Sequence, residues 1–442
     1  MPDFVKIKNT ISNYNRKIFV DSDKSLSIRW VLLASQAMGK STAYNLLNSE
    51  DINSTINCIK KLGIKIVKKN NICEIYGKGI NGFTYKNNIT IDAGNSGTCG
   101  RLILGLLVAS KKKIRLIGDK SLSSRDFSRV TLPLRKFGAK FFPQNKNYLP
   151  ISILGSEYTK PINYFEKIGS AQCKSCMMLA ALNAPGKTII KAKKSRNHTE
   201  LLFKNLNIPI KIKKEKAFEI IEVEGKKNFR SFNYNIPGDI SSSAFFIVLT
   251  LISKKSKLII KNVNVNPTRI GSISILNKMG ASIKIINKRS YKGEILGDIF
   301  VKSKKKLKSI NCPTDLNSSA IDEFLIIFLA ASRAKGISFF KNISELNKKE
   351  SPRLKIASKI LNKMGVKTKL SPNSIKIYGN PSLKLSKKIV VKNFNNDHRV
   401  FMMSVVAALS FGGEWKIYNK NCVNTSFPSF INIAKSLGAK II

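Results

Sequence analysis

Six short polar clusters along the chain combine hydroxyl or amide side chains with basic or acidic ones. They lie near Ser25, Asn95, Ser170, Ser241, Asp322 and Asp397. Each cluster opens an apolar stretch of helical character. A helix N-terminus binds anions readily, because it offers unpaired N–H groups and a positive dipole end. The clusters therefore predict a site for a multiply charged substrate, provided that several helix starts converge. The alternative is six ordinary helix caps that face water. We favour the functional reading because the clusters also carry Lys, Arg, Gln and His, which capping does not need.

A second series of positions predicts where helices end. Amphipathic stretches close at Gly63, Gly138, Gly280, Gly365 and Gly438, and Asn207 takes the glycine's place in one copy. Glycine and asparagine both tolerate the left-handed conformation that ends a helix. A short run rich in Ile, Val or Phe follows each step, which is typical of an entering strand.

The two series interleave and keep phase over six copies. Successive clusters are 70 to 81 residues apart, and each cluster precedes its own helix end by 37 to 43 residues. Each copy reads as strand, polar-capped helix, strand, second helix, turn and strand. A unit of this size is too large for one rung of a solenoid. We therefore expect two globular α/β domains of three units each.

Composition excludes several classes of protein. Of the 442 residues, 43% are apolar, but no stretch reaches the ~18 apolar residues of a membrane span. The first twenty residues lack the features of an export signal. Seven scattered cysteines form no disulfide framework, which fits a reducing compartment. These features predict a soluble, cytoplasmic protein.

Cys173 and Cys176 form a CxxC pair, which could indicate redox chemistry or half of a zinc site. They lie within an apolar helical pattern, and the chain has no second CxxC and only two histidines. We expect both to be buried structural thiols.

The formal charge of +52 is extreme. Nucleic-acid-binding proteins usually gather such charge into a patch or arm with aromatic residues for stacking. Here lysine is spread through nearly every segment, so a compositional bias on solvated faces explains it better. A field this positive attracts anionic metabolites as well as nucleic acid.

Eleven motifs, read in order from about Lys17 to the C-terminus, resemble the family of 3-phosphoshikimate 1-carboxyvinyltransferases, also called 5-enolpyruvylshikimate-3-phosphate synthases. They are DKSLSIR (23–29), DAGNSGTCGRL (92–102), SLSSRDF (121–127), GSAQCKS (169–175), SRNHTELLF (195–203), IPGDISSSAFF (236–246), NPTRIG (266–271), AIDEF (320–324), KKESPRL (348–354), NDHR (396–399) and TSFP (425–428). The resemblance implies an α/β fold of two domains, each with three repeated βαβαββ units around a pseudo-threefold axis, an inside-out α/β barrel. Residues 1–21 plus 236–442 would form one domain and residues 22–235 the other, with the active site in the cleft between them.

The implied reaction transfers the enolpyruvyl group of phosphoenolpyruvate to the 5-hydroxyl of shikimate 3-phosphate and releases phosphate. It belongs to the biosynthesis of chorismate and aromatic amino acids, and it needs no metal or cofactor. It does need charge neutralisation for two phosphates and a carboxylate, an acid–base pair and exclusion of water.

The resemblance also assigns substrate contacts. Shikimate 3-phosphate would be held by Lys24, Ser25, Arg29, Ser170, Ala171, Gln172, Ser195, Arg196, Asp322 and Lys349. Phosphoenolpyruvate would be held by Lys24, Asn95, Gly97, Arg125, Gln172, Arg353 and Arg399. Arginine suits this task because its planar fork pairs both oxygens of a phosphate or carboxylate.

Asp322 and Glu350 are the implied acid–base pair, and Lys24 would bridge both substrates. Which carboxylate handles which proton stays open. Asp397 and His398 would support the site, and His198 would be structural. Gly97 stands where some glyphosate-tolerant members carry alanine, so we expect sensitivity to this herbicide.

Three departures from the family pattern lie near these residues. Asp21-Ser22-Asp23 replaces a Pro-Gly-Ser loop, Asp126 replaces a proline after Arg125, and Asn347 replaces a common arginine. Thr425 stands where some members have a phosphoenolpyruvate-binding lysine, and it inherits no such role.

Two related families are weaker matches. The transferases that act on UDP-N-acetylglucosamine generally use a cysteine acid in a loop that here, at residues 119–130, contains none. RNA 3′-phosphate cyclases need a catalytic histidine and a nucleotide site, and neither is recognisable. We expect a monomer that acts on small molecules, without a nucleic-acid or membrane partner.

Overall fold

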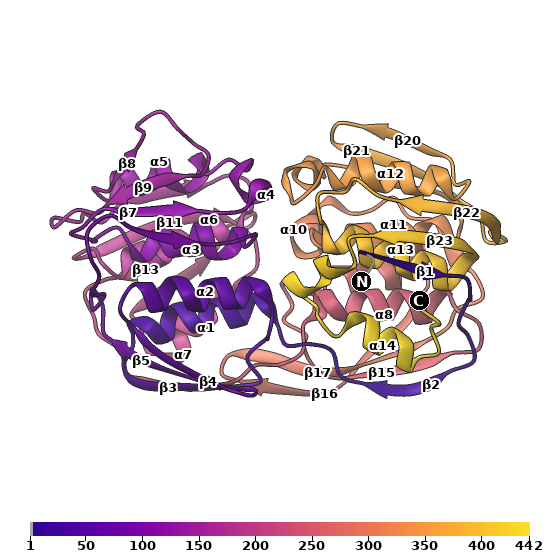
Figure 1. Ribbon diagram of the computed structural model, residues 1–442, viewed down its shortest axis with the longest axis horizontal. Coiled ribbons are helices and arrows are strands. Elements are labelled where there is room, and N and C mark those ends of the chain that lie inside the picture. The colour runs from indigo at the N-terminus through magenta and orange to yellow at the C-terminus, as the bar shows by residue number, and fades with distance from the viewer. Residues whose placement is uncertain (1–2) are drawn as a thin grey trace. The chain divides into compact units, whose positions relative to one another are not determined.

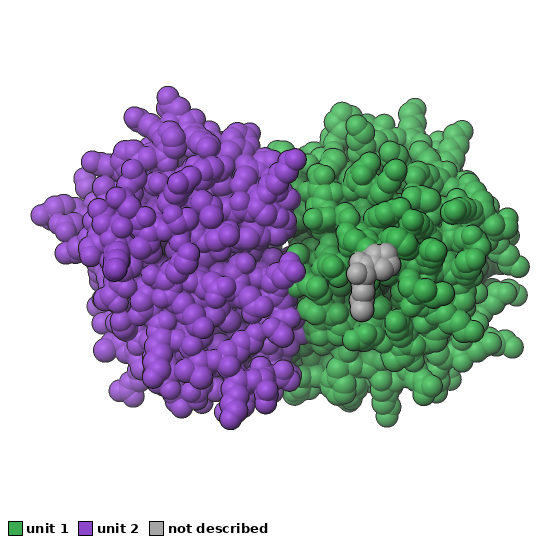
Figure 2. Space-filling model, in the orientation of Figure 1, with its two compact units in different colours: residues 1–21, 237–291, 295–442 green, residues 22–236, 292–294 purple. Residues whose placement is uncertain are grey.

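The computed structural model describes residues 3–442, which divide into two compact units (Figure 2). Unit 1 comprises Met1–Asp21, Pro237–Tyr291 and Ile295–Ile442, and unit 2 comprises Ser22–Ile236 with Lys292–Glu294. The division predicted from the sequence differs at two points. Ile236 and the three residues from Lys292 lie with unit 2.

Unit 2 contains three four-stranded sheets, ordered β14-β3-β5-β4, β6-β7-β9-β8 and β10-β11-β13-β12 (Figure 1). The strands are β3 (Met38–Tyr44), β4 (Lys65–Lys69), β5 (Ile72–Lys78), β6 (Ile89–Asp92), β7 (Ile114–Ile117), β8 (Lys140–Phe142), β9 (Ile151–Leu154), β10 (Asn163–Glu166), β11 (Lys187–Lys193), β12 (Ile210–Lys214), β13 (Phe218–Glu224) and β14 (Asn233–Asn235). The helices are α1 (Lys24–Gln36), α2 (Glu50–Lys61), α3 (Gly97–Leu106), α4 (Lys120–Ser123), α5 (Ser128–Lys136), α6 (Ala171–Ala181) and α7 (His198–Asn205).

Unit 1 also contains three sheets, ordered β16-β17-β15-β2, β18-β19-β21-β20 and β1-β23-β22. The strands are β1 (Phe4–Ile7), β2 (Asn15–Ile18), β15 (Lys257–Asn264), β16 (Ser282–Tyr291), β17 (Glu294–Lys302), β18 (Leu307–Lys308), β19 (Ala334–Phe340), β20 (Thr368–Ser371), β21 (Ser374–Gly379), β22 (Leu385–Val391) and β23 (Gly412–Tyr418). The helices are α8 (Ile240–Ile252), α9 (Gly271–Lys278), α10 (Asn317–Ala320), α11 (Phe324–Ser332), α12 (Arg353–Lys363), α13 (His398–Phe411) and α14 (Phe430–Ser436).

The five four-stranded sheets repeat one pairing rule, which confirms the predicted repeat, and in the three-stranded sheet β1 takes the antiparallel place beside β23. The strand before the polar-capped helix pairs in parallel with the strand after it, as β6 does with β7. The later strands pair antiparallel, as β9 does with β7 and β8. This order is βαβαββ, and the fold is the α/β architecture that the sequence predicts.

Two strands complete sheets that lie far from them along the chain. β14 pairs in parallel with β3 and supplies the first strand of the first repeat in unit 2. β2 pairs in parallel with β15 and does the same in unit 1. The N-terminal strand β1 pairs antiparallel with β23. Residues 3–21 are therefore integral to unit 1.

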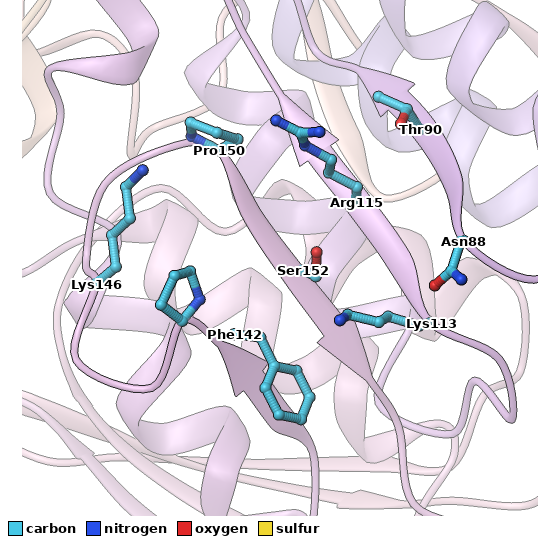
Figure 3. Close-up of a pocket in the computed structure, with 9 residues that line it drawn as sticks. Asn88, Thr90, Lys113, Arg115, Phe142, Lys146, Pro150 and Ser152 are labelled. Atoms are coloured by element: carbon cyan, nitrogen blue, oxygen red, sulfur yellow. The ribbon is translucent and has the colours of Figure 1, made fainter.

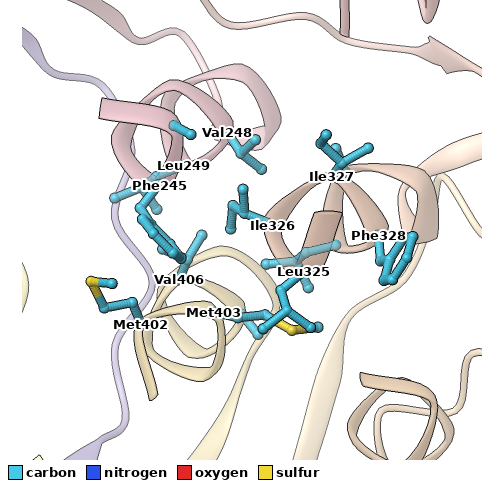
Figure 4. Packing of buried hydrophobic residues seen from close by; sticks show 14 of the residues in the cluster. Phe245, Val248, Leu249, Leu325, Ile326, Ile327, Phe328, Met402, Met403 and Val406 are labelled. Atoms are coloured by element: carbon cyan, nitrogen blue, oxygen red, sulfur yellow. The ribbon is translucent and has the colours of Figure 1, made fainter. Parts of the chain in front are cut away.

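The polar-capped helices form the centre of each unit, and the second helices are amphipathic. In unit 1, α8, α11 and α13 pack against one another through side chains such as Phe245, Ile326 and Met403 (Figure 4). All thirteen residues of α8 and all nine of α11 are buried. A helix that is apolar on every side belongs in a core, because each fully buried Leu, Ile or Phe contributes about 1.5–3 kcal/mol.

The predicted helix ends adopt the expected backbone. All six positions have φ between 53° and 106°, the value at Asn207 being 53° and that at Gly138 106°. Five of them are followed by a strand, and after Gly438 the chain forms a single bridge from Ile441 to Ile7.

Candidate functional site

Three helix starts of unit 2 are capped by side chains that the sequence places just ahead of them. Asp23 Oδ1 accepts from the Leu26 N–H at 2.9 Å, and Ser96 Oγ accepts from Cys99 at 3.2 Å. Ser170 Oγ accepts from Cys173 at 3.3 Å. The caps of α1 and α3 are thus not Ser25 and Asn95, whose side chains are half-buried. At α6, in contrast, the predicted substrate residue Ser170 also caps its helix.

Lys24 is the first residue of α1, and its ammonium group is held by a carboxylate that sequence reasoning did not single out. Lys24 Nζ lies 2.9 Å from Asp51 Oδ2, at the start of α2. The Asp51 side chain is only 7% exposed. A charge-assisted hydrogen bond with so little solvent competition fixes the position of the lysine.

Arg29, one turn into α1, is buried and joins two further helices. Its Nε donates to Thr199 Oγ1 at 2.8 Å, and its NH2 group donates to Ser175 Oγ at 3.1 Å. Its NH1 group donates to the Ser25 carbonyl at 3.1 Å. Ser175 lies in α6 and Thr199 in α7, so Arg29 links α1 to both of these helices.

A second cluster surrounds the start of α3. Asn95 Nδ2 donates to Asp119 Oδ2 at 2.6 Å, and Asn95 Oδ1 accepts from the NH2 group of Arg125 at 3.3 Å. A Cβ atom added at Gly97 would lie 2.9 Å from Arg125 NH1. The glycine therefore gives the Arg125 guanidinium the space to lie against the helix end.

Gln172 connects α6 to α3. Its Oε1 accepts from Arg101 NH1 at 2.6 Å, and its Nε2 donates to Thr98 Oγ1 at 2.9 Å. Ala171 precedes it as the first residue of α6. Arg101 and Thr98 were not predicted, although both lie within the DAGNSGTCGRL motif.

Ser195 and Arg196 lie in the connection from β11 to α7. Ser195 is buried, and its Oγ has no hydrogen-bond partner within residues 3–442. Arg196 is half-buried. In unit 2, Arg29 thus links α1 to α6, and Gln172 links the start of α6 to α3.

Unit 1 places two predicted carboxylates around one buried guanidinium. Arg353 NH2 lies 2.5 Å from Glu350 Oε2, and Arg353 NH1 lies 3.6 Å from Asp322 Oδ1. Asp397 accepts from Arg353 Nε at 2.9 Å and from NH2 at 3.2 Å. Burial alone would lower the pKa of Arg353, but Asp397, Glu350 and Asp322 together raise it. The arginine stays charged and fixes the acid–base candidates.

Asp322 also contacts two more predicted residues. Lys349 Nζ donates to Asp322 Oδ1 at 3.1 Å, and Arg399 NH1 donates to the Asp322 carbonyl at 2.7 Å. The cap position of α11 is Glu323, so Asp322 is not the helix cap.

Asp397 and His398 open α13. Asp397 is fully buried, accepts from the Arg399 N–H at 3.0 Å and accepts from Ser351 Oγ at 2.8 Å. His398 Nδ1 lies 3.2 Å from Thr425 Oγ1. Both contacts hold the segment that carries Arg399.

Glu323, Ser241 and Arg269 form a network that the sequence did not reveal. Ser241, at the start of α8, donates to the buried Glu323 carboxylate. Arg269 NH2 donates to Ser241 Oγ at 2.8 Å. Arg399 NH1 lies 3.9 Å from Glu323 Oε1. This network links the starts of α8, α11 and α13.

The departures from the family pattern have local roles. Asp21 Oδ2 accepts from the Ser429 N–H at 2.9 Å. The Asp126 carboxylate accepts from the Ser128 N–H and hydroxyl, both at 2.7 Å. Asn347 Oδ1 accepts from the Leu354 N–H at 3.2 Å. Ser128 thus engages both oxygens of the Asp126 carboxylate.

Buried polar groups account for other residues of the motifs. His198 Nδ1 lies 2.5 Å from Glu294 Oε1, with both side chains fully buried, which fits the predicted structural role. Lys174 Nζ lies 2.5 Å from Glu200 Oε1, also inside the protein. Cys173 and Cys176 are buried free thiols, as predicted.

Within residues 3–442 every helix is too short or too polar to span a bilayer.

Sequence comparisons identify relatives over the whole chain. The profile of EPSP synthase (3-phosphoshikimate 1-carboxyvinyltransferase) matches residues 8–433. The 3-phosphoshikimate 1-carboxyvinyltransferase of Ruthia magnifica subsp. Calyptogena magnifica is 39% identical over 99% of this chain and 98% of its own. That of Caldicellulosiruptor saccharolyticus is 40% identical over 96% and 97%, respectively.

Solved structures agree. EPSP synthase from Acinetobacter baumannii superposes with a TM-score of 0.86 at 33% identity, and the match covers 99% of both chains. The enolpyruvyl transferase NikO from Streptomyces tendae shares the fold, with a TM-score of 0.76 at 12% identity over 99% of this chain and 98% of its own. Eleven motifs, a sixfold βαβαββ repeat and full-length relatives lead to one assignment: the chain belongs to the EPSP synthase family, the 3-phosphoshikimate 1-carboxyvinyltransferases.

Proposed function

We propose that this protein transfers the enolpyruvyl group of phosphoenolpyruvate to the 5-hydroxyl of shikimate 3-phosphate and releases phosphate. The observation that carries the proposal is the arrangement of Asp322 and Glu350 around Arg353, at 3.6 and 2.5 Å. A proton must leave the attacking hydroxyl and another must reach the methylene carbon, so the reaction needs two such groups.

In this proposal unit 2 supplies most of the anion-binding groups. Lys24, Ser25, Arg29, Ser170, Ala171, Gln172, Ser195 and Arg196 bind shikimate 3-phosphate, together with Asp322 and Lys349 of unit 1. Lys24, Asn95, Gly97, Arg125 and Gln172 bind phosphoenolpyruvate, together with Arg353 and Arg399 of unit 1. Helix starts and arginines neutralise the phosphates and the carboxylate. Both units thus act on one pair of substrates.

Arg353 has a second part in the proposed chemistry. Its Nε and NH2 edge is bound to Asp397, so NH1 is the group that faces Asp322. The Arg353 guanidinium as a whole holds Asp322 and Glu350 in place, and it adds positive charge where phosphoenolpyruvate binds. The attacking hydroxyl gives up its proton as a C–O bond forms at the central carbon, and the methylene takes up a proton to become a methyl group. Loss of phosphate together with one proton of that methyl group then restores the double bond.

The proposal includes a monomer in the cytoplasm without a nucleic-acid partner. Seven buried free thiols support a reducing compartment. The dispersed lysines support a general field that attracts small anions.

Phosphate release from phosphoenolpyruvate tests the function directly. The wild-type protein should release phosphate only when shikimate 3-phosphate is present. Asp322→Ala and Glu350→Gln should each lower kcat by about 10²–10⁴-fold, the usual contribution of a general acid or base.

Glu345→Gln is the matched control, because Glu345 pairs with Lys348 in the same segment at 3.3 Å and has no role in the proposal. It should keep wild-type turnover. Release that is independent of shikimate 3-phosphate, or that needs UDP-N-acetylglucosamine, would contradict the proposed function.

A further inference from the structure

Unit 2 contains a cavity that none of the proposed substrate residues lines. It has a volume of about 600 Å³ and lies over the sheet β6-β7-β9-β8 (Figure 3). Its lining consists of Asn88, Thr90, Lys113, Arg115, Phe142, Pro143, Lys146, Pro150 and Ser152. Ligand sites commonly fall between about 300 and 1,000 Å³.

The floor of this cavity is one row of residues across four strands. Thr90 pairs with Arg115, Arg115 with Ser152, and Ser152 with Phe142. Successive side chains of a strand point to opposite faces. The neighbours Ile91 and Leu116 are fully buried, so the row lies on the outer face of the sheet.

The connection between β8 and β9 forms the rim, and it differs from its counterparts in the other repeats. It spans residues 143–150, which is eight residues, whereas residues 70–71, 215–217, 292–293 and 372–373 make the equivalent connections with two or three. Arg135 NH2 donates to the Gln144 carbonyl at 2.8 Å, and the Phe127 N–H donates to the Asn147 carbonyl at 2.7 Å. These bonds fix a rim that only this repeat has among the five compared.

The charges around the cavity have one sign. Lys113, Arg115 and Lys146 line it, and its lining includes no Asp or Glu among the described residues. In the described part of the chain, none of these three cations forms an ion pair with a carboxylate, unlike Lys24 or Lys174. Lys113 Nζ instead lies 4.9 Å from the centre of the Phe142 ring. Three cations around one cavity favour the binding of an anion.

We propose that this cavity binds a phosphomonoester that carries a planar ring, of the size of a mononucleotide. Arg115 presents a fork that matches two phosphate oxygens, and the two lysines add charge. Phe142, Pro143 and Pro150 offer an apolar surface for the ring. Asn88, Thr90 and Ser152 offer hydrogen bonds to the edge of that ring.

Calorimetric titration of the whole protein with adenosine 5′-monophosphate, inorganic phosphate and adenosine tests this proposal. The monophosphate should bind at least tenfold more tightly than phosphate, and adenosine should bind more weakly than both. The double variant Arg115→Gln/Lys146→Gln should weaken binding of the monophosphate at least tenfold. Phe142→Ala should remove most of its advantage over phosphate.

Lys140→Gln is the matched control. Lys140 lies in β8, is exposed and does not line the cavity, so this variant should bind like wild type. Unchanged thermal midpoints would show that the variants fold. Equal affinities of wild type and the double variant would overturn the proposal, because any binding would then occur elsewhere. If the wild-type protein binds the monophosphate and inorganic phosphate equally tightly, the proposed contact between the ring and Phe142 is refuted. Both readings are independent of the transferase reaction.

Discussion

At the scale of single residues, the candidate site consists of charged side chains held by other charged or polar side chains. Lys24 is held by Asp51, Arg125 by Asn95, and Asp322 by Lys349. Groups that are fixed before the substrate arrives need no reorganisation when charge develops. A residue that holds a substrate-binding side chain in place should therefore matter for activity as the bound side chain itself does.

Asp51→Asn tests this idea for Lys24. The amide cannot neutralise the ammonium group, so Lys24 should lose its fixed position. We expect kcat/KM for phosphoenolpyruvate to fall about tenfold, the magnitude of one hydrogen bond to a charged group. Steady-state kinetics provide the measurement. Glu74→Gln removes the carboxylate that pairs with the exposed Lys40 at 2.9 Å and should have no effect. Equal kinetics of Asp51→Asn and wild type would refute the positioning role.

Gly97 leads to a prediction about glyphosate. The wild-type protein should be inhibited at micromolar concentration, as the family resemblance implies. Gly97→Ala places a methyl group where Arg125 NH1 lies 2.9 Å away, so the guanidinium must shift. Both the inhibitory concentration and the KM for phosphoenolpyruvate should rise. If micromolar glyphosate leaves the turnover of the wild-type protein unchanged, the expected sensitivity is wrong.

The cysteines should be chemically inert in the folded protein. Burial raises the pKa of Cys73 to about 11 and that of Cys312 to about 12, and it also raises the pKa of Cys173. The thiolate is the reactive form, and a pKa near 11 leaves on the order of 0.1% thiolate at pH 8. Reaction with a disulfide reagent should be at least about 100-fold slower in the native state than in denaturant. It should accelerate as pH rises towards 11. Rapid native modification of several thiols would contradict this.

At the scale of elements, the repeat depends on two glycine positions, of which the sequence revealed one. Gly63 and its counterparts end helices with positive φ. A second series, Gly77, Gly155, Gly225 and Gly379, stands within one residue of the end of the last strand of four repeats. A Cβ atom at Gly379 would lie 2.1 Å from the Ala334 carbonyl oxygen. These glycines let a strand pass over the end of a buried helix.

Substitutions at the two kinds of glycine should differ in cost. Gly365 has φ of 86° and no atom within 4 Å of an added Cβ, so Gly365→Ala should cost only about 1 kcal/mol, from backbone strain. Gly365→Asn should cost less, since Asn207 occupies the equivalent position with φ of 53°. Gly379→Ala must move backbone and should cost about 3 kcal/mol or more. Denaturant unfolding of the three variants measures the difference, and equal costs would refute the distinction.

Local patterns account for what the sequence could predict. Helix starts, glycine ends and strand runs are specified by neighbouring residues, so the βαβαββ repeat and the burial of Cys173 could be predicted. The partners of the site residues could not. Asp51 is 27 residues from Lys24, and Arg101 is 71 residues from Gln172. Nothing in their local sequence distinguishes them from surface charges. The roles of the site residues themselves stay predictions.

At the scale of the whole molecule, the charge of +52 should influence kinetics more than stability. Both proposed substrates are multiply anionic, so a positive field raises their encounter rate. Raising the ionic strength from about 0.05 to about 0.3 M should lower kcat/KM several-fold, because the Debye length shrinks. An equal osmolarity of sucrose should not do so. Salt-independent kcat/KM would contradict this role.

The position of the chain ends within unit 1 has a consequence for synthesis on the ribosome. Lys6 N–H donates to the Ile442 carbonyl at 2.7 Å, and the Ile442 N–H donates back to the Lys6 carbonyl at 3.1 Å. β1 therefore completes its pairing only after β23 and Ile442 have been translated. Unit 2 closes its own sheets with β14, which has been translated by residue 235. A nascent chain can therefore complete the sheets of unit 2 while β1, in unit 1, still lacks its partner β23, so the half with Lys24 and Arg29 can fold before the half with Asp322 and Glu350.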